Sequence, residues 1–286
     1  MIELIQQILN GLVVGSVYTL IALGLTIIFG ILGIAHFAHG SVAMFGGYLV
    51  FVLMQAFNIN MPAAMLIAMV AGAILGVVIE RLAYHPVRND PPINAFIIAL
   101  GLTMVIEKLN LLTFGPDQVI VASPFSGSFQ LGGLVVTELR MFVFFTAVVL
   151  VAAMTLFINR SWMGAAIRAV AQNRPAAVLM GVDVNRVSMI VFALSSALGV
   201  AAGALIGALF AVAPGVSGGL VIKGFAVLIL GGLGSIPGAI VGGLVLGVSE
   251  SLAAGFLSSA YKDVISFVIM IAVLLFRPEG LMRGKK

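Results

Sequence analysis

A long run without charge constrains this chain more than any other feature. Between Glu3 and Glu80, 76 consecutive residues include no Lys, Arg, Asp or Glu. A membrane-spanning helix needs about 20 apolar residues, so this run has room for three spans. Over all 286 residues, 8% are charged and 62% are hydrophobic, whereas a soluble domain carries about 25% charged residues. Such a chain cannot cover a water-facing surface, which excludes a soluble enzyme.

The apolar segments predict helices, because Leu20 to Leu32 and Val264 to Phe276 are apolar on every face. The first segment has no basic residues before it and is far longer than the apolar part of a signal peptide, so it is expected to remain as a membrane anchor. Helices are expected at about 4–29, 40–57, 62–83, 93–114, 140–159, 188–213, 222–256 and 261–276. The expected fold is an all-α integral membrane protein with about eight transmembrane helices, between seven and nine. We expect residues 1–286 to form a single polytopic transmembrane domain.

A net charge of +4 is typical of many nucleic-acid-binding proteins, but the positions of the basic residues follow the positive-inside pattern instead, so no nucleic-acid partner is expected. Ten of the fourteen lie in three places: the loop with Arg81 and Arg88, the segment 160–187, and the tail from Arg277. These places are expected in the cytoplasm. The segment 115–139 then faces the periplasm. Its stretches 119–121 and 129–131 suit a short hairpin that docks a soluble partner, with an ordinary connecting loop as the alternative.

Two interruptions break the apolar pattern, one in each half of the chain. The first lies at Gly30 to Gly40, and the second at Gly231 to Gly238, inside a stretch too long for one simple span. Paired interruptions are typical of transporters built from inverted repeats, in which unwound backbone lines the pathway. The alternative is that the glycines only let helices pack closely. The candidate pathway residues are His36, His39, Gly40, Gly231, Gly234, Ser235 and Glu250.

The segment 160–187 carries signals for a short helix outside the membrane. Asn173 can cap it, Pro175 is tolerated in its first turn, Ala176 and Ala177 favour it, and Gly181 can end it. A short helix of small and apolar residues has no lipid to bury it, so we expect it to enter a groove on another protein. The alternative is a helix resting on lipid headgroups, which Arg168 and Arg174 also suit.

Several motifs in order along the chain resemble the permease subunits of bacterial ABC importers, specifically the LivH-like branched-chain amino-acid permeases. The motifs are His36 to Gly40 followed by Met44, Gly46, Gly47 and Tyr48, then Glu80 to Arg88, Met163 to Ala169, Leu230 to Ala239 and Arg277 to Leu281. The resemblance covers nearly the whole chain. Members commonly have Asn where this chain has His36, which leaves the role of His36 open.

The resemblance implies a permease that carries branched-chain or related hydrophobic amino acids across the inner membrane. Its implied partners are a second homologous permease subunit, two cytoplasmic ATP-binding subunits and a periplasmic substrate-binding protein. It also implies that the segment from Gly164 to Asp183 holds a coupling helix that docks in a cleft of the ATP-binding subunit. The candidate coupling residues are Gly164, Arg168, Asn173, Arg174, Pro175, Ala176, Ala177, Met180, Gly181 and Asp183.

Ionisable residues at membrane depth are costly, so each needs a role. His36 and His39 either line the path or satisfy carbonyls that the helix break frees. Two histidines three residues apart are too few for a zinc site. Glu250 can meet the ammonium group of a substrate or a partner helix, or can lie solvated near an interface. Lys223 is expected to anchor the end of a span at the interface.

The same interfacial role is expected for Lys262 and Asp263. Glu107 and Lys108 are adjacent on one helix about two turns from its outer end, and a structural role is expected for them. The glycine run at 231–238 lacks the Gly-Lys-Ser or Gly-Lys-Thr of a phosphate-binding loop.

No catalytic arrangement is recognisable, so we expect a transport protein rather than an enzyme, without a cofactor, and ATP hydrolysis on partner subunits. One alternative is the same machine carrying urea or short-chain amides. Another is a secondary transporter or channel that needs no ATPase. A secondary carrier is expected to place acidic residues near the middle of several spans, and the uncharged run offers none.

Overall fold

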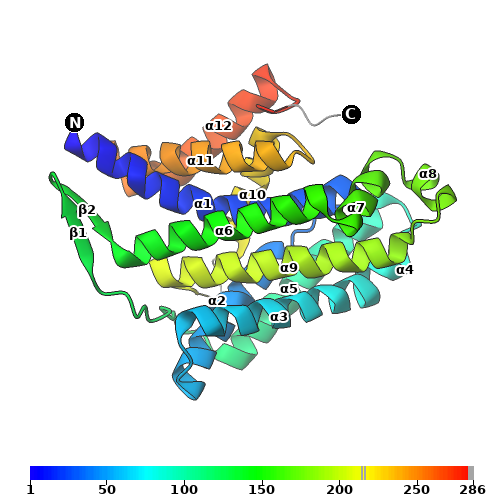
Figure 1. Cartoon of the computed structure of the whole chain (residues 1–286), viewed down its shortest axis with the longest axis horizontal. Coiled ribbons are helices and arrows are strands. Elements are labelled where there is room, and N and C mark those ends of the chain that lie inside the picture. Colours follow the sequence, from blue (N-terminus) through cyan, green and yellow to red (C-terminus); the bar gives the residue numbers. More distant parts are fainter. Residues whose placement is uncertain (214, 216, 283–286) are drawn as a thin grey trace.

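The computed structural model describes residues 1–213, 215 and 217–282. These residues are almost entirely helical, with one short hairpin (Figure 1). The helices are α1 (Ile2–Leu32), α2 (His39–Phe57), α3 (Met61–Ile79), the π-helical turn η1 (Glu80–Tyr84), α4 (His85–Val87), α5 (Pro92–Phe114), α6 (Glu138–Arg160), α7 (Trp162–Gln172), α8 (Arg174–Leu179), α9 (Val184–Leu209), α10 (Ser217–Gly231), α11 (Ile236–Phe256), the 3₁₀ turn η2 (Ser259–Tyr261) and α12 (Lys262–Phe276). The strands are β1 (Ser128–Leu131) and β2 (Leu134–Thr137).

Within the described residues, eight helical segments are long and apolar enough to cross a membrane. They are α1, α2, α3 continued through η1 and α4, α5, α6, α9, α11, and η2 with α12. The helix α10 is also apolar but has 15 residues. The expectation of an all-α membrane protein with about eight spans is confirmed. Three of these spans, α1 to α3, begin before Arg81, as the uncharged run predicts.

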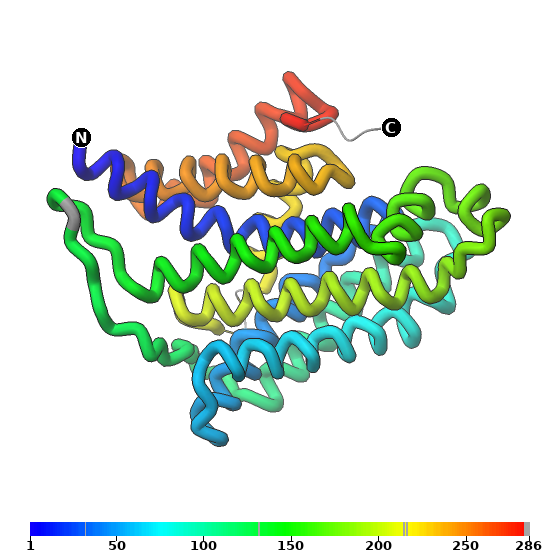
Figure 2. The backbone as a smooth tube through the Cα atoms, viewed as in Figure 1, coloured from blue at the N-terminus to red at the C-terminus, as the bar shows by residue number. Residues whose placement is uncertain are grey.

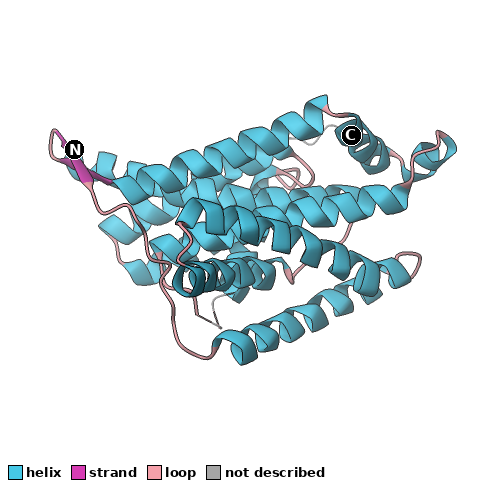
Figure 3. Cartoon of the chain, turned by 60° about the horizontal axis from the view of Figure 1, so that its bottom comes forward, coloured by secondary structure: helices cyan, strands magenta, loops and turns pink. Residues whose placement is uncertain are grey.

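The long helices α1, α6, α9 and α3 lie side by side, so the bundle has two distinct ends (Figures 1 and 3). One end carries α4, α7 and α8, and we refer to it as the α8 end. The other end carries the hairpin beside the N-terminus, as the tube in Figure 2 shows, and we refer to it as the hairpin end. The basic loops with Arg81, Arg88 and Arg174 therefore lie at the α8 end.

The expected helix at 188–213 is displaced in the structure, where α9 covers Val184–Leu209. It begins earlier because the Asp183 carboxylate accepts hydrogen bonds from the backbone N–H groups of Asn185, at 2.9 Å, and Arg186, at 3.2 Å. An acidic side chain at this position satisfies N–H groups that have no partner inside the helix. The expected stretch at 222–256 is two helices, α10 and α11, and α10 begins at Ser217.

Both expected interruptions are present, and they meet in space. Gly33 ends α1 with a φ of 65°, and Gly232 and Gly234 separate α10 from α11 with φ values of 102° and 77°. Only glycine adopts this left-handed backbone readily. A Cβ atom placed on Gly30 would lie 3.5 Å from the Cα atom of Gly234. The two breaks thus lie against each other near the α8 end.

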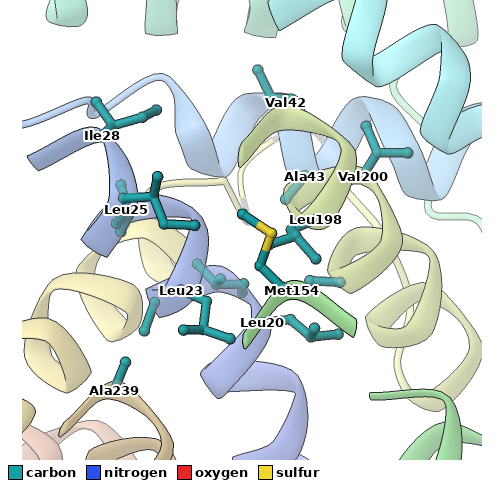
Figure 4. Packing of buried hydrophobic residues seen from close by; sticks show 14 of the residues in the cluster. Leu20, Leu23, Leu25, Ile28, Val42, Ala43, Met154, Leu198, Val200 and Ala239 are labelled. Atoms are coloured by element: carbon teal, nitrogen blue, oxygen red, sulfur yellow. The ribbon is translucent and has the colours of Figure 1, made fainter. Parts of the chain in front are cut away.

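The core is built around α1 and α9, which are mostly buried, whereas α12 is mostly exposed. Figure 4 shows Leu20, Leu23 and Leu25 of α1 among the packed side chains. The helices α1 and α11 approach closely through glycines, and we refer to this contact as the glycine seam. A Cβ atom on Gly15 would lie 2.6 Å from the carbonyl oxygen of Gly243. Small residues at such contacts let two backbones pack directly against each other in a membrane.

The hairpin differs from the one expected. β1 pairs antiparallel with β2, so 129–131 pairs with 134–136 rather than with 119–121. Gly132 and Gly133 take φ values of 56° and 89°, which a two-residue hairpin turn requires. Val119 instead forms a bridge to Val212, three residues after the end of α9. The Gln6 side chain bonds both backbone groups of Val135, donating at 3.0 Å and accepting at 2.9 Å, and so attaches β2 to α1.

Candidate functional site

The segment after α6 folds into two short helices, α7 and α8, that are not among the eight spans. Ser161 caps α7 by accepting a hydrogen bond from the Gly164 backbone N–H at 2.8 Å. Ala166, Ile167 and Val170 are buried on one face of α7, while Trp162 on the other side is 77% exposed. The sequence reasoning did not single out this amphipathic helix. It packs against α6, α1 and α9 and also contacts α8.

Two of the candidate coupling residues attach α7 to α6. Gly164 allows close packing, since a Cβ atom there would lie 2.5 Å from the carbonyl oxygen of Phe157. The Arg168 guanidinium donates a hydrogen bond to the carbonyl oxygen of Ile158. Their contacts are therefore internal, and any change at either residue alters how α7 is held.

The helix α8 has the local signals that the sequence predicts. The Asn173 side chain accepts a hydrogen bond from the Ala176 backbone N–H at 3.0 Å, with Pro175 in the first turn. Gly181 follows with a φ of 82°. Ala177 is buried and its carbonyl accepts from the Val182 backbone N–H at 3.0 Å, which folds the chain back after the helix. These residues shape the segment rather than present a surface.

The surface that α8 presents is apolar. Leu179 is 88% exposed, Met180 83% and Val178 54%, and we refer to these three residues as the apolar tip. The tip lies at the extreme of the α8 end, beyond the long helices (Figure 1). Of the three, the sequence reasoning named only Met180, because Val178 and Leu179 look like ordinary helix formers. Arg174, Pro175 and Ala176 lie on the same short helix, and Asp183 caps the helix that follows.

The two histidines of the first interruption are fully buried between α1, α2 and α9. His36 Nδ1 lies 2.8 Å from the Tyr84 hydroxyl oxygen, and its ring meets Phe192 edge-on at 5.4 Å between centroids. His39 fills space left by glycines, because a Cβ atom on Gly24 would lie 2.6 Å from its Cε1 atom, and one on Gly199 2.9 Å. Neither histidine lines the two cavities described below. His39 of α2 thus contacts α1 and α9, and His36 contacts η1 and α9.

The second interruption is closed by its own hydrogen bonds. Ser235 caps α11 by accepting from the Gly238 backbone N–H at 3.1 Å. The C-terminal segment returns to this turn, where the Leu281 backbone N–H donates to the Leu230 carbonyl at 2.8 Å. Gly231 packs against Gly238, and Gly40 packs against α10, since its Cβ would lie 3.0 Å from that of Val221.

A small cavity of about 80 Å³ joins the two interruptions to the coupling segment. Its walls include Thr26 and Gly30 of α1, Arg168 of α7, and Gly234 with Ile236. We refer to it as the α8-side cavity. One candidate pathway residue, Gly234, and one candidate coupling residue, Arg168, therefore line the same space.

Glu250 lies in a buried polar cluster that joins four helices. Its carboxylate accepts hydrogen bonds from the Tyr18 hydroxyl at 2.8 Å, from Lys223 Nζ at 2.5 Å and from the Ser266 hydroxyl. Lys223 Nζ also lies 2.9 Å from Asp263 Oδ1. We refer to these five residues as the Glu250 cluster. It links α1, α10, α11 and α12.

The expectation that Lys223 anchors a span end is wrong, because it lies inside α10 with its side chain 15% exposed. A signal for this was present in the sequence. Lys223 is the one charged residue between Arg186 and Glu250, so a lone base and a lone acid occupy consecutive apolar segments. Ionisable groups in membrane helices usually pair with one another.

A larger cavity of about 270 Å³ lies beside the Glu250 cluster, and we refer to it as the hairpin-side cavity. Val14, Val17 and Tyr18 of α1 line it, and so do the C-terminal end of α9 and the first turns of α10 and α12. Lys223, Lys262 and Asp263 supply its charged groups. The candidate pathway residue Glu250 thus lies behind the wall of the cavity rather than in it.

Comparison with known proteins decides the family. The sequence pattern of the family described as branched-chain amino acid transport system / permease component matches residues 7–274. The chain belongs to this family. The resemblance drawn from the motifs is therefore confirmed, and the permease is a multi-pass transport protein of the membrane.

Two relatives from Salmonella typhimurium (strain LT2) are named permease proteins of the high-affinity branched-chain amino acid transport system. LivH is 38% identical to this permease, over 97% of this chain and 95% of LivH. LivM is 25% identical, over 93% of this chain and 68% of LivM. A solved structure titled "PsaBC from Streptococcus pneumoniae in complex with Fab" matches with a TM-score of 0.52 and 11% identity, over 94% of this chain and 91% of the other. At that identity the match shows the fold alone.

Proposed function

We propose that this permease is the membrane subunit of an ABC importer that carries branched-chain or related hydrophobic amino acids across the bacterial inner membrane. The names of the relatives support this cargo over urea or short-chain amides. The observation that carries the mechanism is the apolar tip, held outside the spans on a capped helix. An exposed apolar patch of this kind usually marks a protein-binding surface.

Transport in this proposal follows alternating access driven by partner ATPase subunits. Closure of two cytoplasmic ATP-binding subunits would move the segment α7–α8 and, through the contacts of Gly164 and Arg168 with the end of α6, shift the spans. ATP hydrolysis belongs to the partners. Arg168 lines the α8-side cavity together with Gly30 and Gly234. This position supports the proposal that a movement of α7 and α8 on docking is transmitted to the two interruptions.

The basic loops at the α8 end support a cytoplasmic location for that end, by the positive-inside rule. Met1 and the segment 115–139 with its hairpin would then face the periplasm, where a substrate-binding protein delivers its cargo. The extensively exposed apolar faces of α12, α5 and α6 leave room for lipid and for a second permease subunit. The similarity of LivM to this chain supports a heterodimer of two related permeases.

A single substitution in the apolar tip tests the docking proposal. Leu179→Glu places a charge where an apolar groove would bury it, at a cost of several kcal/mol, and we expect loss of the co-purifying ATP-binding subunits and of ATP-dependent leucine uptake in proteoliposomes. Leu179→Met keeps the volume and apolar character and serves as the matched control. Normal subunit binding and uptake by Leu179→Glu would overturn the coupling assignment.

The cargo and the energy source are tested with the wild-type importer. We expect uptake of labelled leucine that needs both ATP and the binding protein, and no uptake of labelled urea. Leucine uptake that continues without ATP and follows an ion gradient would instead support a secondary transporter. Uptake of urea without leucine would move this permease to the alternative cargo.

A further inference from the structure

The hairpin-side cavity combines charged and apolar walls, and none of the candidate coupling residues lines it. We propose that this cavity binds a zwitterionic amino acid with an apolar side chain during transport. The inference rests on the proposed function, because it names the site at which this permease itself recognises the cargo.

The charged groups at the cavity balance each other in two parts. Lys223 Nζ lies between two carboxylates, at 2.5 Å from Glu250 and 2.9 Å from Asp263, so these three groups carry a formal charge of −1. Lys262 adds +1, and its Nζ lies 5.2 Å from the centre of the Phe210 ring. Together with Glu250 behind its wall, the cavity is neutral, and Asp263 and Lys262 supply an acidic and a basic group to its lining.

This arrangement matches the two charges of an amino acid backbone. The Asp263 side chain is 71% exposed, so its carboxylate can accept hydrogen bonds from an ammonium group. The Lys262 ammonium can exchange its contact with the Phe210 ring for a substrate carboxylate. One carboxylate and one ammonium in the cavity disfavour a ligand with a net charge. Such a ligand would leave one charged group without a partner where little water is present.

The remaining walls suit an aliphatic side chain. Val14 and Val17 of α1, Ile206 and Leu209 of α9, and Leu220 of α10 line the cavity. Its volume of about 270 Å³ lies near the lower limit of ligand pockets, roughly 300 Å³, so only a small molecule fits. A small hydrophobic amino acid requires both charged groups and branched aliphatic groups, and the lining of this cavity supplies both.

A competing explanation is that Lys262 and Asp263 only anchor α12 at the membrane surface. That role needs no cavity and no selectivity. It predicts that a small zwitterion leaves the chemistry of the cavity wall unchanged, so a probe on the wall separates the two explanations.

The chain offers a clean probe because it has no cysteine. Gly219 lines the cavity, and its neighbour Gly218 does not. A Cβ atom on either glycine meets no atom within 4 Å, so both positions accept a side chain. Gly219→Cys and Gly218→Cys therefore form a matched pair. Each is assembled with the full importer in phosphatidylglycerol vesicles, which avoid a lipid headgroup that carries both an ammonium and a phosphate, and is labelled with a maleimide.

We expect leucine to slow maleimide labelling of Gly219→Cys, by about tenfold at a concentration ten times its Kd, and to leave Gly218→Cys unchanged. Lysine and glutamate should give little protection, because their side chains add a net charge. 4-Methylpentanoate and isoamylamine should also give little, because the first lacks the ammonium and the second lacks the carboxylate. Asp263→Asn and Lys262→Gln in the Gly219→Cys background should weaken the protection by leucine about tenfold or more. Asp117→Asn, another exposed carboxylate at the hairpin end, is the control.

Leucine uptake by the same vesicles separates this inference from the proposed function. Vesicles that import leucine but show no protection of Gly219→Cys would overturn the cavity assignment while the proposed function stands. Equal protection by 4-methylpentanoate would also overturn it, because recognition of the ammonium is part of the inference. Protection in vesicles that import nothing would support the site and count against the transport proposal.

Discussion

Lys223 Nζ and Glu250 Oε1 lie 2.5 Å apart inside the bundle, and the Glu250 side chain is 1% exposed. Removing two charges from water costs several kcal/mol for each, and their attraction offsets this only when both are present. The pair therefore makes the packing of α10 depend on that of α11. Tyr18 and Ser266 extend the same dependence to α1 and α12.

The first prediction concerns this pair. Lys223→Met leaves the Glu250 carboxylate buried without its cation, and we expect a loss of about 3 to 5 kcal/mol of stability, measured as a lower thermal unfolding midpoint in detergent. Asp263→Asn removes the other carboxylate from the same lysine. Because the Asp263 side chain is 71% exposed, it should cost about 1 kcal/mol or less. Equal losses in the two variants would show that burial is not the cause.

The second prediction concerns the glycine seam. Gly15→Leu forces a side chain into a space where a Cβ atom already lies 2.6 Å from the Gly243 carbonyl oxygen. We expect a cost of about 3 kcal/mol or more, seen as little monodisperse protein after purification. Gly101→Leu, where nothing lies within 4 Å of the added Cβ, is the control. A folded Gly15→Leu variant at the wild-type yield would refute direct backbone packing.

The third prediction concerns His36 and Tyr84, whose polar atoms lie 2.8 Å apart. Tyr84→Phe and His36→Phe should each cost about 1 to 3 kcal/mol, because each leaves a buried partner unsatisfied. The double variant should cost less than the two single losses together, and thermal unfolding of all four proteins measures the difference. His36→Asn keeps a polar group and should fall between wild type and His36→Phe. Additive losses would mean that the two groups act separately.

The fourth prediction concerns the start of α8. Asn173→Ala removes the side-chain oxygen that caps the Ala176 backbone N–H, at a cost of about 1 kcal/mol. Since α8 has six residues, we expect faster hydrogen exchange at 176–180 and weaker docking of ATP-binding subunits. Asn173→Asp retains a capping oxygen and should restore both measurements. A failure of Asn173→Asp to restore slow exchange would argue that the Asn173 side chain has another role.

The fifth prediction concerns the attachment of the hairpin. Gln6→Ala removes two hydrogen bonds to Val135, so the amides of 128–137 should exchange faster while those of α1 stay protected. Gln55→Ala, an exposed glutamine near the end of α2, serves as the control. Unchanged exchange in the hairpin would show that it is held by other contacts.

Much of the fold could be predicted because a lipid bilayer requires each spanning segment to be a helix of about 20 apolar residues. Apolar length marks the spans, and Asn173 with Gly181 marks α8, since capping depends on neighbours in the sequence. The start of α9 was less predictable, because several residues before 188 could begin the helix and Asp183 caps it at Val184. The hairpin pairing expected from the sequence is wrong, because Val119 pairs with Val212, which lies 93 positions later in the chain.

The candidate sites were less accessible to sequence reasoning, because they depend on which helices become neighbours. Glu250 was recognised as costly, yet its cation and its hydroxyl donors come from helices that are distant in the chain. The sequence leaves His39 between a pathway role and a structural role, because nothing local shows that Gly24 and Gly199 leave a space for its ring. The apolar tip was only partly recognised, since exposure is a property of the assembled bundle.

The helix α1 forms part of both cavities, through Val14 and Val17 at one and through Thr26 and Gly30 at the other. A rotation of α1 about its own axis would therefore change both volumes in a single event. The opening of one cavity and the closing of the other would then be the same movement of α1 and would occur at the same time. Because α1 lines both cavities, it can couple them directly, without another helix between them.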